Sequence, residues 1–274
     1  MSSSNPIWYV YGVVPASTNV STLPTGLDDS DVVLESTDRV AALVSVLDAG
    51  RYDASSIEKN GGDLEWLSPR AVAHDLVLTR ASDAASGAVI PLPMFSLFSS
   101  RDAVRAMLDE RSATLTSTLR RVEAGREFAL RVYRVDSESL EAMTTLSPRL
   151  GELAREALAA SAGQRYLLER KLAGEKKSEL RTVSQRIVEE IMTELSAAAL
   201  RHARSPIPRG SDADTAANGT MVLNAAFLVA PAALVDFQKM LTTLIERYGH
   251  QGFRFDFTGP WPPYHFVGGE SGGD

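Results

Sequence analysis

The side chains best suited to acid–base or metal chemistry in this sequence are four histidines: His74, His202, His250 and His265. A zinc site built on one element needs H-x-x-H, H-x-x-x-H or H-E-x-x-H spacing, and none of these patterns occurs. His74-Asp75 offers an acid–base pair near the start of a predicted helix. The simpler interpretation, which we favour, is a partly exposed helix residue beside an acid that suits the helix dipole.

Other routes to catalysis are also missing from the sequence. It contains no cysteine, which excludes disulfides, thiolate metal sites and cysteine nucleophiles. There is no G-x-S-x-G elbow, no G-x-x-x-x-G-K-[ST] phosphate loop and no G-x-G-x-x-G after a strand. The carboxylate pairs Asp28-Asp29 and Glu189-Glu190 are expected to be solvated, and the mixed-charge stretch 171–181 is expected to be a helix surface. We therefore predict no enzyme, no cofactor and no metal.

Composition places the chain among folded globular proteins. Its 274 residues are 44% hydrophobic and 23% charged, with a formal net charge of -7. An acidic surface disfavours nucleic acid, whose phosphates need basic partners. No run of 18 or more apolar residues occurs, and the first residues lack the basic and apolar regions of a signal peptide. We expect a soluble, cytoplasmic protein without a membrane span.

The first half predicts a domain over residues 1–136. Strands are expected over 7–14, 31–36, 40–47 and 127–135, with residues 48–65 as a loop. Residues 89–98 are apolar but contain two prolines, which indicates an interrupted edge strand. A helix over 69–86 carries Val72, Leu76 and Thr79 on one face, and a second begins with a Ser99 and Asp102 capping box. This order predicts a variant of the ferredoxin-like sheet, covered on one face by two helices.

The second half predicts another mixed domain over residues 137–267. Helices are expected over 137–146, 149–161 and much of 165–204, followed by a mobile loop over 205–219. A strand over 221–229, a helix from Pro231 to Tyr248 capped by Gly249, and a strand over 253–257 complete the domain. A Gly-rich tail over 268–274 is expected to be disordered. The predicted fold class is thus α+β with two domains, the second containing a long helix.

The C-terminal stretch Gly259-Pro-Trp-Pro-Pro-Tyr-His-Phe266 has a composition that ordinary secondary structure does not explain. Its prolines fix φ and exclude a helix, so its aromatic rings cannot be buried by a regular period. Such a stretch either folds back as a rigid plug on its own domain or offers aromatic anchors to a partner. The residues of this structural or partner-contact motif are Gly259, Pro260, Trp261, Pro262, Pro263, Tyr264 and Phe266.

This ending, following a strand over 253–257, resembles the C-terminal signature of the gas vesicle protein F/L family. Three further segments match that family in order. They are the opening strand Tyr9-Val-Tyr-Gly-Val-Val14, the Ala73-His-Asp75 helix leading to Val89-Ile-Pro-Leu-Pro-Met94, and Leu223-Asn-Ala-Ala-Phe-Leu-Val229 before the last helix. One departure is visible: Met94-Phe-Ser-Leu-Phe-Ser99 stands where members show an Arg-Phe-Gly-Thr-like turn, so any role of that arginine is not carried over.

The resemblance implies two α+β domains, a part in gas vesicle assembly, and contact with the small hydrophobic shell protein and with other accessory proteins. It implies no catalytic residues. A folded partner could cover the apolar surface of a shell subunit before incorporation. Candidate surfaces are the edge of the N-terminal sheet and the long helix. The edge residues we single out are Tyr9, Tyr11, Phe95 and Phe98.

Two alternatives remain open from the sequence. The first is a small-molecule-binding protein or enzyme on a ferredoxin-like scaffold, which a deep pocket lined by His74 or His265 plus a carboxylate would favour. The second is a helical scaffold whose long helix pairs with a partner helix. The sequence separates neither the F-type from the L-type role nor a component retained in the vesicle from one that attends assembly only.

Overall fold

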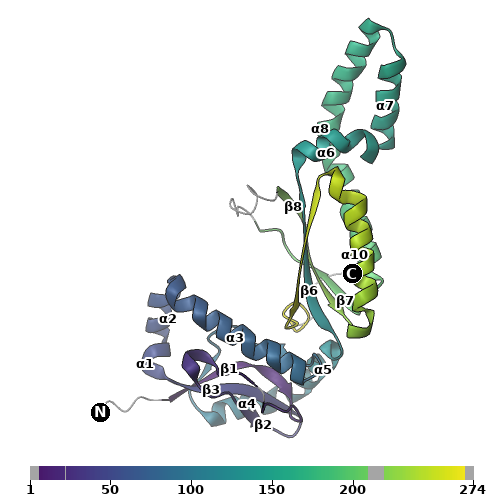
Figure 1. The fold of residues 1–274 in the computed structure, drawn as a ribbon. Helices are drawn as coiled ribbons and strands as arrows, with labels where there is room; N and C mark the ends of the chain where they lie inside the picture. Colours follow the sequence, from purple (N-terminus) through teal and green to yellow (C-terminus); the bar gives the residue numbers. More distant parts are fainter. Residues whose placement is uncertain (1–5, 22, 209–218, 269–274) are drawn as a thin grey trace. The chain divides into compact units, whose positions relative to one another are not determined.

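The computed structural model describes residues 6–21, 23–208 and 219–268 of the chain, and these form two compact units (Figure 1). The first unit contains residues Met1–Glu127 together with Pro260–Asp274, and the second contains Phe128–Gly259. The chain therefore leaves the first unit within one strand and returns to it within another. These ranges differ from the expected 1–136 and 137–267, because the C-terminal segment belongs to the first unit. The expected disordered tail lies, except for Gly268, outside the described residues.

The first unit is built on an antiparallel sheet with the strand order β2-β3-β1-β4, and β5 also pairs with β1. Strand β1 is therefore internal, with β3 along one side and the short β4 and β5 along the other. A register shift between Val10 and Gly12 marks a bulge in β1. The strands are β1 (Pro6–Pro15), β2 (Val33–Ser36), β3 (Val40–Asp48), β4 (Ile90–Pro91) and β5 (Leu97–Phe98).

Helices cover both faces of this sheet (Figure 1), which corrects the expectation of one covered face. Helix α3 (Leu64–Ala84) packs with Tyr9, Tyr11 and Leu43 on one face. Helices α4 (Arg101–Glu110) and α5 (Ser112–Val122) pack with Val10 and Val44 on the other. The physical reason is visible in the strands themselves, because successive residues of β1 and β3 are apolar and a sheet buried on both faces needs such runs.

Local signals shift several element boundaries in the first unit. Asp63 accepts a hydrogen bond from the Glu65 amide and caps α3 five residues before the predicted start, so Pro69 lies inside the helix. Ser100, and not Ser99, caps α4. The single helix expected after it is divided at Arg111 into α4 and α5. The expected loop over 48–65 forms α1 (Ala49–Tyr52) and α2 (Ala54–Asn60), and a 3-10 turn η1 (Leu27–Asp29) precedes β2.

The second unit is built on a four-stranded antiparallel sheet with the order β7-β8-β6-β9. Its strands are β6 (Arg126–Arg134), β7 (Arg201–Arg204), β8 (Thr220–Val229) and β9 (Phe253–Trp261). Its helices are α6 (Asp136–Leu146), α7 (Pro148–Ala159), α8 (Ala162–Ser196) and α10 (Leu234–Tyr248), with the 3-10 turns η2 (Pro231–Ala233) and η3 (Gly249–Gln251). The long helix ends at Ser196, so the last part of the predicted helix is instead strand β7, which pairs with β8.

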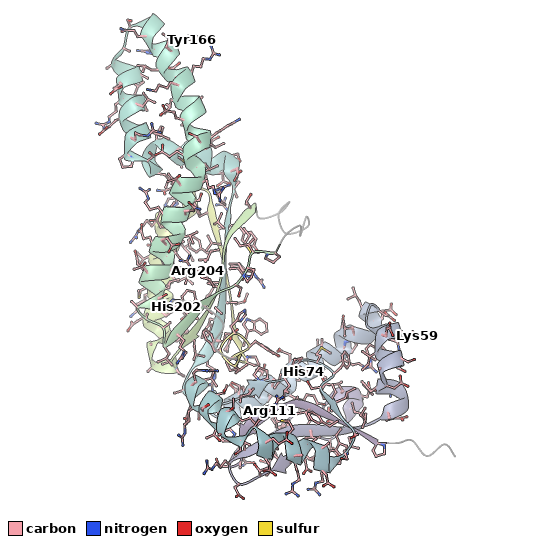
Figure 2. All side chains as sticks on the ribbon, turned by 180° about the vertical axis from the view of Figure 1, so that it is seen from behind. Lys59, His74, Arg111, Tyr166, His202 and Arg204 are labelled. Carbon is pink, nitrogen blue, oxygen red and sulfur yellow. The ribbon has the colours of Figure 1, made fainter. Side chains whose placement is uncertain are left out.

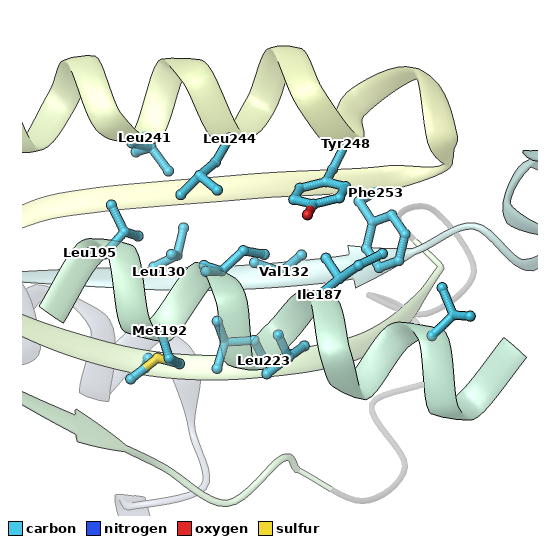
Figure 3. Packing of buried hydrophobic residues seen from close by; sticks show 14 of the residues in the cluster. Leu130, Val132, Ile187, Met192, Leu195, Leu223, Leu241, Leu244, Tyr248 and Phe253 are labelled. Carbon is cyan, nitrogen blue, oxygen red and sulfur yellow. The ribbon is translucent and has the colours of Figure 1, made fainter. Parts of the chain in front are cut away.

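The core of the second unit lies between its sheet and the helices α8 and α10 (Figure 3). Leu130 and Val132 of β6 meet Ile187 of α8 and Leu244 of α10, and all four side chains are fully buried. Helix α10 ends at Tyr248 with Gly249 as its C-cap, as expected, and η3 follows directly. The left-handed turn is made by Gly252 at φ 85, where an added Cβ would collide with Ser139.

The α+β class expected from the sequence is confirmed by these two antiparallel sheets with their helices. Of the expected mobile loop 205–219, residues 209–218 lie outside the described residues. No helix in the part of the chain that the structure describes is long and apolar enough to cross a bilayer.

Candidate functional site

His74 is buried in the first unit and forms part of a polar group beneath α3. The Tyr9 hydroxyl donates to His74 Nδ1 at 2.7 Å, and the ring of Tyr11 stacks on the imidazole with a centroid distance of 5.6 Å. Burial lowers the pKa of His74 to about 4, partly offset by a hydrogen bond to the backbone of Leu92. The ring is therefore neutral at neutral pH and acts as a structural acceptor for Tyr9. Asp75 takes a different partner, so the His74-Asp75 pair does not converge.

A second polar group joins η1 to α3 through Arg70, which is only 8% exposed. Its guanidinium donates to Asp28 Oδ1 at 2.7 Å and to the Tyr52 hydroxyl at 2.9 Å, and it lies 4.4 Å from the centre of the Trp66 ring. Tyr52 in turn donates to Asp28 Oδ2 at 2.8 Å, and burial raises the pKa of Tyr52 to about 12. Asp28 is exposed, as expected of a solvated carboxylate, but it is also paired, because a buried guanidinium requires a carboxylate.

The singled-out sheet residues Tyr9 and Tyr11 are fully buried, and their strand β1 is internal. They therefore do not form an edge that an incoming strand could pair with. Phe95 and Phe98 are partly buried on the other side of β1, where β5 is a short edge piece. Phe95 has a φ of 62 and stacks on Trp66 with ring centres 5.5 Å apart. This backbone strain lies in the segment where the sequence departs from the family turn.

The C-terminal motif from Pro260 onward belongs to the first unit and not to the expected domain over 137–267. Glu127, 2% exposed, accepts from the His265 amide at 3.0 Å and from the imidazole Nδ1–H at 2.6 Å. This hydrogen bond to the carboxylate raises the pKa of His265. Phe266 is buried, and its carbonyl accepts from Arg121 at 3.2 Å. No sequence pattern indicates the role of Glu127, because it is one polar residue at the start of an apolar strand.

The remaining motif residues divide between burial and exposure. Pro262 and Pro263 are buried, whereas Gly259 and Pro260 are exposed. Trp261 and Tyr264 leave 40% and 42% of their surface in solvent. The Tyr264 hydroxyl donates to Asp75 Oδ1 at 3.4 Å, so this ring lies against α3. Burial raises the pKa values of Tyr264 and Asp75. The motif is thus anchored through its prolines and Phe266, and it presents two rings at the surface.

Helix α3 carries the largest departure from the sequence-based expectation. Val72 and Leu76, predicted to face the core, are 67% and 42% exposed, and Leu64 is 72% exposed. A surface depression at the C-terminal end of α3 is lined by Pro24, Leu76, Arg80, Asp83 and Ala84. Neither His74 nor His265 lines it, so this depression is not the histidine pocket that would favour an enzyme.

The second unit shows exposed apolar side chains at one place and paired charges at another. Leu158, Tyr166 and Leu167 are all more than 60% exposed near the turn between α7 and α8. Figure 2 labels Tyr166 there. His202 and Arg204 lie on β7 and not on a helix end (Figure 2). Arg204 pairs with Glu189 at 2.7 Å. The stretch 171–181, expected to be a mixed-charge helix surface, lies on α8. Two of its glutamates, Glu175 and Glu179, form ion pairs with Arg149 of α7.

A metal centre is not formed by the described part of the chain, where no three His, Asp or Glu side chains are arranged to hold an ion. What the geometry offers is a set of buried polar groups that fix the first unit, together with apolar side chains left in solvent. Such surfaces are typical of sites that bind other proteins.

Comparison with known proteins identifies the family. The family model described as gas vesicle synthesis protein GvpL/GvpF matches residues 7–268. The chain therefore belongs to this gas vesicle protein family. It is 29% identical over 273 residues to gas vesicle protein L of a Streptomyces species, covering 97% of this chain and 94% of that one. It is 24% identical over 269 residues to gas vesicle protein L1 of Halobacterium salinarum, covering 94% and 89% of the two chains.

Two crystal structures share the fold. Gas vesicle protein GvpF from an Anabaena species superposes with a TM-score of 0.69 at 18% identity, covering 98% of this chain and 99% of that one. GvpF from Microcystis aeruginosa gives a TM-score of 0.67 at 18% identity, covering 96% and 99%. The resemblance drawn from the proline–aromatic ending is thus confirmed at the level of the family.

Proposed function

We propose that this protein is an assembly factor that binds the hydrophobic gas vesicle shell protein, and other vesicle accessory proteins, during vesicle formation. The observation that carries the proposal is the family match over residues 7–268, which makes the chain a gas vesicle protein along almost its whole length. We place its action in the cytoplasm, at the growing vesicle. It acts by binding and not by catalysis.

The distribution of polar and apolar groups supports a binding role. The charged or histidine side chains buried in the first unit each have a structural partner; they are Glu35, Arg70, His74 and Glu127. At the same time large apolar side chains stay in solvent on α3 and near the α7–α8 turn. A shell subunit that excludes water exposes apolar surface before incorporation, and a folded partner with apolar side chains of its own can cover that surface.

The surfaces expected from the sequence are supported unequally. An incoming strand has no access to β1, so a sheet-edge site at Tyr9 and Tyr11 is disfavoured. The long helix α8 remains a candidate binding surface, because Tyr166 and Leu167 near its start are exposed. The C-terminal motif is a further candidate through Trp261 and Tyr264.

The direct test is co-purification. The full chain is tagged and co-expressed with the small shell protein of the same gas vesicle gene set, and the bound fraction is quantified after washing. We expect stoichiometric or near-stoichiometric capture of the shell protein. Shell protein that never co-purifies, although both proteins are present in the lysate, contradicts the proposed function.

A further inference from the structure

Strand β9 lies at one edge of the four-stranded sheet of the second unit, where it pairs with β6 (Figure 1). Among the strands that the structure describes, no other pairs with β9, because the order is β7-β8-β6-β9. The opposite edge strand, β7, is four residues long and contains two arginines. Short length and charge are common ways of protecting an edge from pairing with another chain. β9 is nine residues long and carries one charge of each sign, so it is the edge that another strand can join.

The register of β9 against β6 shows which of its backbone groups face outward. The Val135 amide donates to the Gly252 carbonyl at 2.8 Å, so these two residues lie opposite each other. The ion pair between Arg131 and Asp256, at 3.4 Å, fits the same register, because both residues lie four positions further along. In an antiparallel pair, the residues whose backbone groups face the neighbouring strand alternate along the chain. The β9 residues whose backbone groups face away from β6 are therefore Phe253, Phe255 and Phe257.

The side chains of this stretch divide between the two faces of the sheet. The phenylalanine rings lie on the core face: Phe253 is fully buried, and the other two rings are partly buried against the same core. Arg254 lies on the opposite face, where it pairs with Glu138 and is 45% exposed. Asp256 lies on that face too, where it pairs with Arg131 and is 44% exposed. Nearly half of each charged side chain on β9 thus remains open to a further partner.

The sequence of this stretch is self-complementary when two copies run antiparallel. If Phe255 lies opposite Phe255 of a second copy, Arg254 of each copy lies opposite Asp256 of the other. Phe253 of each copy then lies opposite Phe257 of the other. The outward-facing backbone groups of the phenylalanines meet in the hydrogen-bonded positions of this register. Arginine and aspartate take the non-hydrogen-bonded positions, where side chains on facing strands come closest.

Charge also disfavours the neighbouring registers. A shift by one residue sets the outward-facing backbone groups of one copy opposite groups that already face β6 in the other. A shift by two residues restores the backbone pairing. It places Arg254 opposite Arg254 or Asp256 opposite Asp256, and like charges directly opposite are destabilising. The register centred on Phe255 is therefore the one in which both backbone and charge agree.

We propose that this protein forms a two-fold symmetric dimer, in which β9 of two copies pairs antiparallel about Phe255. The two four-stranded sheets then join into one continuous sheet. Because each contact occurs twice, the interface closes at two copies and leaves no edge on β9 for a third. The inference does not depend on the proposed function, because the oligomeric state is measured without a vesicle partner.

The first test is a charge exchange on the full chain, with molar mass measured by light scattering after gel filtration. We expect the unmodified chain to be dimeric at about 100 μM or below. Asp256→Arg sets two arginines against two arginines across the interface, and Arg254→Asp sets two aspartates against two aspartates. We expect either change alone to raise the dissociation constant of the dimer at least about tenfold.

Recombining the charges restores the complementarity. In an equimolar mixture of the two single variants, each arginine of one chain again lies opposite an aspartate of the other. We expect a mixed dimer, and we expect the double variant, Arg254→Asp with Asp256→Arg, to dimerise with itself. The matched control is Arg201→Asp on β7, an exposed arginine on the other edge strand, which leaves the dimer unchanged. Thermal melting checks that every variant is folded.

The outcomes test the edge and the register separately. A monomeric unmodified chain overturns the proposal, and so do single variants that dimerise as strongly as the unmodified chain. Equal loss in the β7 control also overturns it, because charge reversal at any site then suffices. Mixtures and double variants that stay monomeric overturn the register centred on Phe255.

A second test does not rely on charge. The chain contains no cysteine, so a single introduced cysteine reports only its own neighbours. Tagged Arg254→Cys is mixed with untagged Asp256→Cys and oxidised mildly, and we expect the main product to link the two different chains, since these positions lie opposite each other. Each variant alone is expected to give little linked product. Linking within one variant as the main product overturns the register, and the absence of any linked product overturns the dimer.

Discussion

Helices α3 and α10 each pack on a sheet, but the apolar stripe in the sequence is much stronger in α10, and the buried faces of the two helices differ in kind. The predicted stripe of α10 is largely the one that is buried, with Phe237 and Leu244 fully enclosed. The predicted stripe of α3 contains Val72 and Leu76, and it faces solvent. The buried face of α3 holds Arg70 and His74 together with the fully buried Val77, Leu78 and Ala81.

The difference teaches that a few apolar residues at helical spacing do not by themselves identify the buried face of a helix. Beneath α10 the sheet offers Leu130, Val132 and Phe227, so burying the stripe removes the most apolar surface from water. Beneath α3 the first unit offers apolar side chains such as Leu43. It also offers the hydroxyls of Tyr9 and Tyr52 and the carboxylate of Asp28. Groups of that kind must be paired when buried, and α3 supplies the pairs.

The largest loss of stability is expected for a substitution on α10. Phe237→Ala removes a fully buried ring that lies edge-on to Phe227 at 5.3 Å. We expect a loss of about 4 kcal/mol in the free energy of unfolding, measured by urea denaturation. A loss below about 1 kcal/mol, similar to that of an exposed position, would contradict an apolar core under α10.

On α3 the corresponding change is at a charged residue. Arg70→Met keeps the length of the side chain but leaves Asp28 and Tyr52 without their donor. Because Asp28 is partly open to water, we expect a loss of about 3 kcal/mol, at the lower end for a broken buried pair. Val72→Met on the outer face serves as the control. The comparison fails if the control destabilises the chain as much as the Arg70 change.

The pH dependence of stability sharpens the role of His74. Its pKa is lowered to about 4 in the folded chain, against an ordinary value of about 6.5, so unfolding takes up a proton between these two values. Stability therefore falls as the pH is lowered from about 6.5 to about 4, by about 2 to 3 kcal/mol. Urea midpoints across this range measure it, with His74→Gln as the reference that does not titrate. Identical pH profiles for the two proteins would refute this assignment.

The smallest effect is expected at Val72 and Leu76, the exposed apolar residues on the outer face of α3, which we call the α3 ridge. Val72→Ser and Leu76→Ser alter exposed side chains, and each is expected to change the free energy of unfolding by less than about 0.5 kcal/mol. Calorimetric melting of the two variants checks this. A marked loss of stability would show that the ridge is packed within the folded chain, and it would remove the basis for a docking surface there.

Several elements of the fold, and the family, could be predicted from the sequence. Strong apolar runs bounded by prolines predicted β1 and β8. The spacing of Phe237, Leu241 and Leu244 predicted the buried face of α10. These patterns are informative because they act through local backbone conformation and through the apolar area that is buried. The proline–aromatic ending indicated the family. Its prolines also limited the ending to a plug or a set of anchors, since they leave the chain no regular hydrogen-bonded alternative.

Only the tertiary structure decided which face of α3 is buried, that β1 is internal, and that Glu127 holds the C-terminal motif. Each of these depends on partners distant in sequence: Arg70 meets a carboxylate 42 positions away, and His265 meets one 138 positions away. A sequence pattern reports how apolar a face is, but the burial of a charged or polar side chain depends on whether the fold brings it a partner.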